Sequence, residues 1–334
     1  MDFLKDIVKE IGDDYTQLAS DISDSEQFID TGSLVFNGLV SGSIFGGVSS
    51  NKITAIAGES STGKTFFALA VAKNFLDTNP DAYVLYFDTE SSITRSLLES
   101  RNIDMKRFVV INVVTIEEFR TKALKAIDIY LKTDIQDRKP CMFVLDSLGM
   151  LSTEKEIRDA LDDKQVRDMT KSQLVKGAFR MLTLKLGQAN VPLIVTNHTY
   201  DVIGAYVPTK EMGGGSGLKY AASTIIYLGK KKEKDGKEVI GNIIKAKTHK
   251  SRLSKENKQV DIRLYYDQRG LDKYYGLLEL GEIGGLWKNV AGRYEIGGKK
   301  VYAKQIYSKP EEYFTDDVLQ ALDEISQKEF SYGS

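Results

Sequence analysis

The feature that most constrains this chain is a glycine-rich loop between an apolar segment and a helix-like one. Residues 53–57 (ITAIA) predict a buried strand, and residues 64–75 predict a helix. Between them GESSTGKT, at 58–65, fits the phosphate-loop pattern: backbone N–H groups cradle phosphates, the lysine reaches β and γ oxygens, and the last hydroxyl ligates Mg²⁺. The sequence therefore predicts a nucleotide site formed by Gly58, Glu59, Ser60, Ser61, Thr62, Gly63, Lys64, Thr65 and Phe66.

Carboxylates follow two further strand-like runs. Asp146 ends the apolar run 142–145, where it would complete the Mg²⁺ shell begun by Thr65, usually through water. The run 83–87 leads into Asp88-Thr89-Glu90, and Glu90 is the candidate general base that activates water. Acidic residues after a strand also serve as helix caps, so the residues alone leave both readings of this pair open.

Apolar strand-like runs alternate with helix-like ones from residue 52 to residue 197. This order predicts an α/β fold with a mostly parallel sheet and helices on both of its faces. The runs 223–228, 239–245 and 260–266 lack long intervening helices and predict an antiparallel extension of that sheet. We expect a core at 32–284, preceded by an N-terminal helix and linker at 1–31 and followed by a small C-terminal subdomain at 285–334.

Charge is near balance overall, but cations cluster between residues 230 and 258. The cluster comprises Lys230, Lys231, Lys232, Lys234, Lys237, Lys245, Lys247, Lys250, Arg252, Lys255 and Lys258. Such a stripe indicates a phosphate-facing surface, with a merely solvated hairpin as the alternative for 230–237. The single Cys141 lies in an apolar run and predicts a buried, reduced thiol. With neither a signal peptide nor an apolar run of about 18 residues, we expect a cytoplasmic protein without membrane contact.

Six motifs taken together resemble the RecA family of recombinases. They are GESSTGKT, YFDTES, FVLDSLGML, VTNHTY, MGGGSGLKYAAS and KSRLSKENKQ, and they follow one another in the family's order and approximate spacing from about residue 30 to residue 325. Within the family the chain looks most like the recombinases of T4-like bacteriophages. The resemblance implies a RecA-type P-loop ATPase core that uses ATP and Mg²⁺. It also implies a DNA-dependent ATPase that forms filaments on single-stranded DNA and catalyses homologous pairing and strand exchange in recombination, repair and recombination-dependent replication.

The resemblance also assigns roles to individual residues. Glu90 would activate the attacking water beside Lys64, and His198 would sense the γ-phosphate and couple ATP to the DNA loops. Lys250 and Arg252 align with paired cations that reach the γ-phosphate of a neighbouring subunit. The segment 26–30 resembles the strand that each subunit adds to its neighbour's sheet, with Phe28 or Ile29 as the anchor.

Two segments, 151–169 and 199–216, resemble the family's first and second DNA loops. Residues there and in the following helix would stack on bases or meet phosphates: Met169, Lys171, Lys176, Arg180, Val202, Ile203, Tyr206, Lys210, Gly214 and Gly215. The implied partners are single-stranded DNA, homologous duplex DNA, further copies of the chain in a helical filament, a single-strand-binding protein and a loading mediator. The implied location is the host cytoplasm if the chain is phage-encoded, and the nucleoid otherwise.

One position departs from the family pattern. Leu97 stands where relatives have a tyrosine that stacks on adenine, so the base would pack on an apolar surface or on Arg95. Two other classes also fit parts of the sequence. A hexameric helicase or a ring-forming ATPase would share Lys64, Asp146 and Glu90, whereas a catalytically silent DNA-binding module would not need them.

Overall fold

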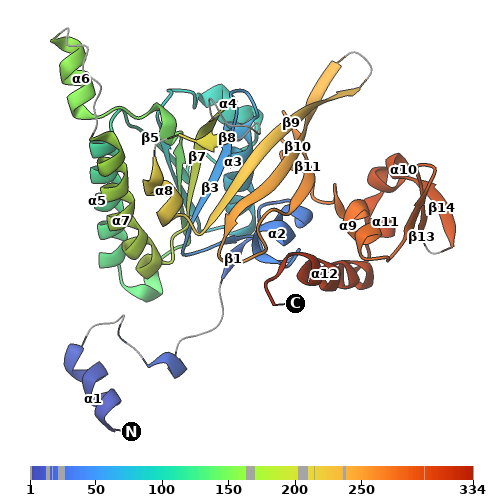
Figure 1. Cartoon of the computed structure of the whole chain (residues 1–334), viewed down its shortest axis with the longest axis horizontal. Coiled ribbons are helices and arrows are strands. Elements are labelled where there is room, and N and C mark those ends of the chain that lie inside the picture. The colour runs from blue at the N-terminus through green and yellow to red at the C-terminus, as the bar shows by residue number, and fades with distance from the viewer. Residues whose placement is uncertain are drawn as a thin grey trace.

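The computed structural model describes residues 2–12, 16, 18–21, 27–162, 170–201, 210–213, 215–235, 238–296 and 298–333. Its centre is a large mixed sheet (Figure 1). Within the described residues, the strands of this sheet are β3 (Ile53–Gly58), β4 (Tyr83–Asp88), β5 (Phe108–Asn112), β6 (Cys141–Asp146), β7 (Leu193–Asp201), β8 (Lys210–Met212), β9 (Thr224–Asp235), β10 (Glu238–Ser251) and β11 (Gln259–Tyr265).

The sheet has a parallel part and an antiparallel part. Its order is β11-β10-β9-β3-β7-β6-β4-β5, with β8 paired to the end of β7. Neighbours from β9 to β5 are parallel, whereas β9, β10 and β11 pair antiparallel with one another. The predicted α/β fold with an antiparallel extension is confirmed.

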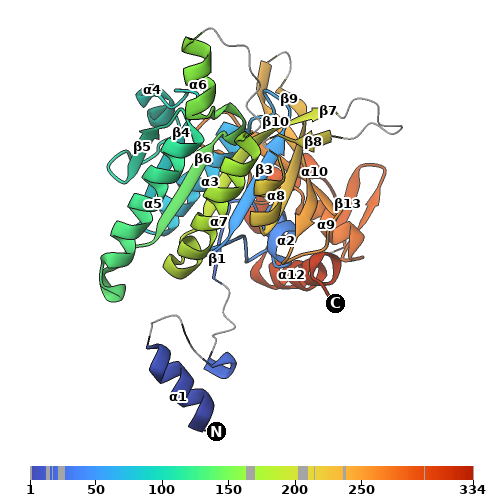
Figure 2. The same ribbon diagram turned by 60° about the vertical axis from the view of Figure 1, so that its left-hand side comes forward.

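Successive side chains of a strand point to opposite faces of the sheet, and each face has its own hydrophobic core. Tyr86 of β4 faces the core under α2 (Leu34–Ser41) and α3 (Lys64–Thr78), whereas Phe87 faces the core under α5 (Ile116–Lys132) and α7 (Lys171–Ala189). The rings of Phe87 and Phe119 on α5 meet edge to face, with centroids 5.1 Å apart. Helices therefore cover both faces of the sheet, as Figure 2 shows from the side of α5 and α7.

Shorter elements connect the layers. They are η1 (Ala19–Asp21), β1 (Phe28–Ile29), β2 (Val48–Ser49), α4 (Arg95–Ser100), η2 (Ile135–Asp137), η3 (Leu148–Met150), α6 (Glu154–Leu161) and α8 (Ser216–Ala221). Helix α6 forms part of the predicted first DNA loop at 151–169, and Thr153 and Glu156 form a capping box at its start. Residues 163–169 and 202–209 of the two predicted DNA loops lie outside the described residues.

The N-terminal helix α1 (Asp2–Ile11) lies away from the core in both views (Figures 1 and 2). Its apolar face is exposed: Phe3 is 74% exposed and Leu4 is 58% exposed. Strand β1 pairs antiparallel with β2 of the same chain, and Ile29 packs against the core beneath it. The predicted N-terminal helix is thus present, but β1 already has a partner strand within its own chain.

A small C-terminal layer follows β11. It contains α9 (Leu277–Ile283), a three-stranded sheet of β12 (Lys288–Val290), β13 (Arg293–Ile296) and β14 (Lys299–Tyr302), and the helices α10 (Ala303–Ser308), α11 (Pro310–Tyr313) and α12 (Asp316–Phe330). Helix α12 returns to α2. Its Asp323 accepts hydrogen bonds from the Ser43 hydroxyl (2.6 Å) and the Ile44 N–H (2.8 Å). The boundaries 1–31, 32–284 and 285–334 stay a prediction.

Candidate functional site

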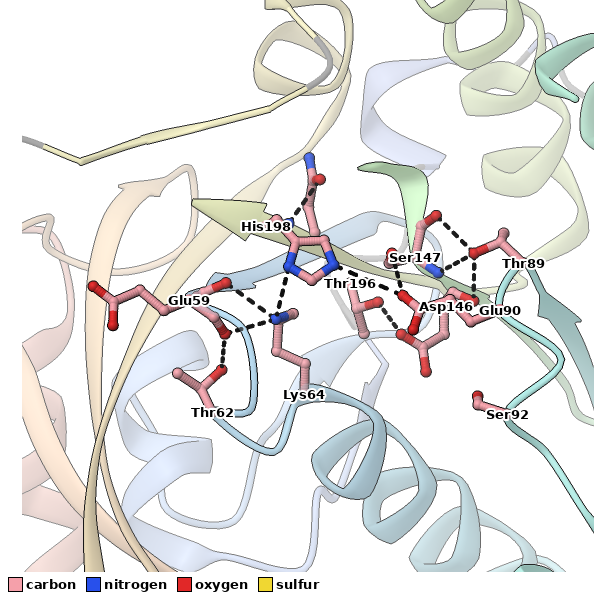
Figure 3. A network of polar contacts seen from close by, with 12 residues as sticks. Glu59, Thr62, Lys64, Thr89, Glu90, Ser92, Asp146, Ser147, Thr196 and His198 are labelled. Atoms are coloured by element: carbon pink, nitrogen blue, oxygen red, sulfur yellow. Dashed lines mark hydrogen bonds and ion pairs between the residues drawn. The ribbon is translucent and has the colours of Figure 1, made fainter. Parts of the chain in front are cut away.

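The phosphate loop lies between the end of β3 and the start of α3. Gly63 stands at the N-cap of α3 with φ of 90°, a left-handed conformation that favours glycine. Lys64 is buried, and its ammonium donates to the carbonyls of Gly58 (3.0 Å) and Glu59 (2.9 Å), as Figure 3 shows. Burial lowers the pKa of Lys64, while the nearby charges of Asp146 and Glu90 act to raise it. The backbone carbonyls of the phosphate loop therefore bind the partly desolvated ammonium of Lys64.

Asp146 occupies the end of β6 and is almost fully buried. Its carboxylate accepts a hydrogen bond from the Tyr86 hydroxyl at 2.6 Å and another from the Thr196 hydroxyl. Burial raises the pKa of Tyr86 well above its ordinary value, so this tyrosine remains a donor. Both carboxylate oxygens are engaged by hydroxyls, which fits a Mg²⁺ shell completed through water beside Thr65 in the first turn of α3.

The two acids after β4 have different environments. Asp88 is 2% exposed, and its carboxylate accepts from the backbone N–H groups of Glu90 (3.0 Å) and Ile93 (2.9 Å). Glu90 is 41% exposed at its side chain and accepts from the Ser147 hydroxyl at 3.1 Å. Asp88 is thus the backbone cap, and Glu90 is the carboxylate that faces the site.

His198 of β7 lies between the lysine and the glutamate (Figure 3). Its Nδ1 is 3.4 Å from the Lys64 ammonium, and its Nε2 is 3.7 Å from Glu90. The His198 carbonyl accepts from the Gly213 N–H at 3.0 Å, and the Asn197 side chain donates to the Gly213 carbonyl at 2.8 Å. The histidine and its neighbour thus join the phosphate loop to Gly213, which follows β8 within the second predicted DNA loop.

Two of the predicted DNA-binding cations line a hollow on the α7 face. Lys176 and Arg180, one turn apart on α7, are exposed and border a hollow of about 790 Å³ together with Tyr220 and Arg252. Gly217 of α8 permits this arrangement, because an added Cβ would lie 2.7 Å from the backbone nitrogen of Lys176. The structure therefore brings α7, α8 and the end of β10 to one basic, partly apolar surface.

Other predicted DNA-binding residues lie elsewhere or are not described. Lys171 pairs with Glu156 of α6 at 3.4 Å, and Lys210 pairs with Glu59 of the phosphate loop. Gly215 precedes α8 with φ of 74°. The remaining predicted contacts lie outside the described residues: Met169, Val202, Ile203, Tyr206 and Gly214.

The predicted trans-acting cations flank the C-terminal end of α8. The Lys250 ammonium donates to the carbonyls of Lys219 (2.6 Å) and Ala222 (2.7 Å), and burial lowers its pKa. The exposed Arg252 reaches the Tyr220 carbonyl at 3.4 Å. Neither contacts the phosphate loop of its own chain among the hydrogen bonds and ion pairs of the described residues.

The basic stripe follows a long hairpin. Lys231 and Lys232 on β9 and Lys245 and Lys247 on β10 are exposed, whereas Lys230 donates to the Ser61 carbonyl of the phosphate loop. In Figure 1 this hairpin extends beyond the body of the sheet. Lys237 lies outside the described residues.

Phe66 of the predicted nucleotide site contacts Tyr266, an aromatic residue to which the sequence assigned no role. The ring of Tyr266 lies 5.7 Å from that of Phe66 in the first turn of α3, and the Arg101 guanidinium lies 4.1 Å above Phe66. Leu97 packs against the apolar core, and Arg95 is an exposed partner of Glu99. No local motif marks Tyr266, because the turn after β11 brings it to α3 only in the fold.

A phosphate loop at a strand–helix junction, with a buried acid at the end of another parallel strand of the same sheet, defines a P-loop nucleotide-binding protein. The family described as RecA N-terminal domain matches residues 2–272. The chain is 34% identical to the Recombination and repair protein of Enterobacteria phage T4 over 261 residues, which are 78% of this chain and 65% of that protein.

Two bacterial proteins named Protein RecA are also similar. The one from Thermus aquaticus is 25% identical over 334 residues, covering 96% of this chain and 94% of that protein. The one from Francisella tularensis subsp. novicida is 28% identical over 289 residues, covering 84% and 76%. The chain belongs to the RecA family of recombinases. In the described part of the chain, no helix is long and apolar enough to cross a membrane.

Proposed function

We propose that this chain is a DNA-dependent ATPase that forms filaments on single-stranded DNA and catalyses homologous pairing and strand exchange. One observation carries the proposal. His198 contacts both Lys64 and Glu90, and its carbonyl accepts from the N–H of Gly213, which lies within the second predicted DNA loop. A nucleotide site and a candidate DNA loop thus share one residue, as coupling between ATP and DNA requires.

At the nucleotide site, Lys64 and the backbone of the loop would bind the ATP phosphates. Thr65 and Asp146 would hold Mg²⁺, which neutralises charge that develops on the phosphates. Glu90, fixed by Ser147, orients and deprotonates water, since it has an exposed carboxylate oxygen and Asp88 is occupied by backbone N–H groups. His198, which lies between Lys64 and Glu90, would sense whether a γ-phosphate is bound.

At the DNA interface, Lys176 and Arg180 would meet backbone phosphates at the hollow, whereas Lys171 and Lys210 would meet them at separate points of the two predicted DNA loops. Tyr220 contributes an exposed ring at the same hollow, and bases stack readily on such rings. Met169, Val202, Ile203 and Tyr206 of the predicted DNA loops would insert between bases or stack on them. Homologous duplex DNA would approach the same basic face.

Assembly would place two parts of a neighbouring subunit against this chain. Lys250 and Arg252, which do not serve their own phosphate loop, would act on the γ-phosphate of the neighbour. Phe28 or Ile29 would anchor the linker to that neighbour's sheet, which requires β1 to exchange its pairing with β2 of its own chain for the neighbour. The edge strand β5 suits such an addition, because in the described residues it pairs with β4 on one side only and leaves backbone groups free on the other. Val109 (51% exposed) and Val110 (37% exposed) of this strand are accessible to an added strand. A head-to-tail contact of this kind builds a helical filament unless it closes.

The remaining assignments rest on the family resemblance. Within a cell we place the protein in the cytoplasm, or in the host cytoplasm if phage-encoded. It would work with a single-strand-binding protein and a loading mediator during recombination, repair and recombination-dependent replication.

The deciding experiment measures ATP turnover with and without single-stranded DNA, alongside negative-stain micrographs with a slowly hydrolysed ATP analogue. We expect DNA to stimulate turnover and the micrographs to show helical filaments on DNA. Closed hexameric rings would instead favour a helicase or ring-forming ATPase. Absence of turnover under both conditions would favour a silent DNA-binding module.

A further inference from the structure

Glu59 is the acidic residue of the phosphate loop, yet its carboxylate is directed away from the phosphate-binding side. Figure 3 shows it pointing away from Lys64, which uses the Glu59 carbonyl instead. The carboxylate forms an ion pair with Lys210, and the two side chains are 57% and 46% exposed respectively. A negative charge in the nucleotide loop therefore holds a cation from another element.

That cation comes from the end of the second DNA loop. Lys210 is the first residue of β8 and pairs in register with Asp201 of β7, so these two residues close the loop between the strands. The fold thus places one lysine between the nucleotide loop and the predicted DNA surface. Lys230 of the basic hairpin reaches the same loop and donates to the Ser61 carbonyl. Two lysines from separate basic elements are therefore attached to the phosphate loop.

We propose that Glu59 is a positioning residue that competes with DNA phosphates for Lys210. The inference rests on the proposed function, because it requires that the chain binds single-stranded DNA. An ammonium is a compact point charge on a flexible stem, and a carboxylate and a phosphate oxygen are alternative anionic partners for it. While Glu59 holds Lys210, this cation is withdrawn from the DNA, and releasing it makes it available for a phosphate contact.

The expected size of the effect follows from exposure. Both side chains lie in water, where ion pairs contribute modestly, so removing the Glu59 charge should tighten single-strand binding by about two- to five-fold. The gain should shrink as salt rises, because exposed charges are screened. The effect should also require Lys210, which distinguishes the inference from a general loss of negative charge near DNA.

The test compares the affinity of the full chain for a fluorescent single-stranded oligonucleotide, with a slowly hydrolysed ATP analogue at saturating concentration. The variants are Glu59→Gln, Lys210→Gln and the double variant. Glu211→Gln is the matched control, since Glu211 is the next residue of β8, is 63% exposed and pairs with Lys219 at 3.4 Å. Nucleotide titrations confirm that each variant is saturated.

We expect Glu59→Gln to tighten DNA binding, Lys210→Gln to weaken it, and Glu59→Gln to add nothing in the Lys210→Gln background. An unchanged DNA affinity in Glu59→Gln would overturn this inference and leave the proposed function untouched. Equal tightening in Glu211→Gln, or in the double variant relative to Lys210→Gln, would overturn it as well, because the effect would then be general electrostatics. A wild-type chain that binds no single-stranded DNA would overturn the proposed function and this inference together.

Discussion

Glu90→Gln tests the catalytic assignment with a minimal change of shape. The glutamine carbonyl oxygen can still accept from the Ser147 hydroxyl, which lies 3.1 Å from Glu90 Oε1, so the side chain should keep its position. The amide cannot take a proton from water. A general base contributes about 10²- to 10⁴-fold to rate, which corresponds to about 3–5 kcal/mol in the barrier.

The same substitution should leave folding and binding nearly unchanged. The Glu90 side chain is 41% exposed, so removing its charge leaves no deeply buried group without a partner. We therefore expect a change in unfolding free energy within about 0.5 kcal/mol. ATP and DNA affinities should likewise stay close to wild type. The predicted signature is therefore a large loss of turnover at normal binding.

The assay is steady-state ATP hydrolysis with saturating single-stranded DNA, together with nucleotide and DNA titrations. Glu99→Gln is the matched control, because Glu99 is an exposed glutamate of α4 whose partner is Arg95 at 2.7 Å. Turnover within a few fold of wild type in Glu90→Gln would refute the assignment. An equal loss in Glu99→Gln would show that the effect is not specific to the site.

Four other outcomes follow from the same geometry. Lys64→Ala should weaken ATP binding itself, measured by nucleotide titration, because it removes the cation facing the β and γ phosphates. Arg252→Ala should fold and bind nucleotide but lose DNA-stimulated hydrolysis, and in mixtures it should enter wild-type filaments and inhibit their ATP turnover. Phe28→Ala should enter filaments poorly and inhibit wild-type turnover less. Equal inhibition by the two variants in mixing assays would show that the interface assignment is wrong. Single-strand affinity should fall steeply with salt in fluorescence titrations, and a flat response would contradict the phosphate contacts. Burial raises the pKa of Cys141 to about 12, so its thiol should resist alkylation at pH 8 until the protein is unfolded.

Much of the fold could be predicted because its signals are local. Buried parallel strands appear as short apolar runs, and helix α5 shows a clear amphipathic repeat after its Thr115 cap. Helix α2 was not predicted because it is buried on nearly every side. It therefore lacks the polar face that would show a helical repeat in its hydrophobic pattern. Helix α6 was not predicted because its segment was assigned to a DNA loop, although Thr153 and Glu156 are a readable capping signal.

The sequence by itself determined the phosphate loop, because all of its groups come from eight consecutive residues and their conformation follows from glycine and from helix initiation. It also indicated Asp146, since parallel strands deliver their carboxyl ends to one edge of the sheet. It named Glu90 as the candidate base, but the residues alone left open whether the acids after β4 are a helix cap or a catalytic group. That choice depends on which carboxylate the backbone after β4 captures.

Tertiary structure alone decided the partners that come from distant segments. Lys210 meets Glu59 across 151 positions of sequence, and Tyr266 reaches Phe66 through the turn after β11. Lys250 engages the end of α8 because β10 runs antiparallel to β9 beside it. Such contacts are set by strand order and register, which depend on how all the apolar runs pack together, so no local pattern of residues encodes them.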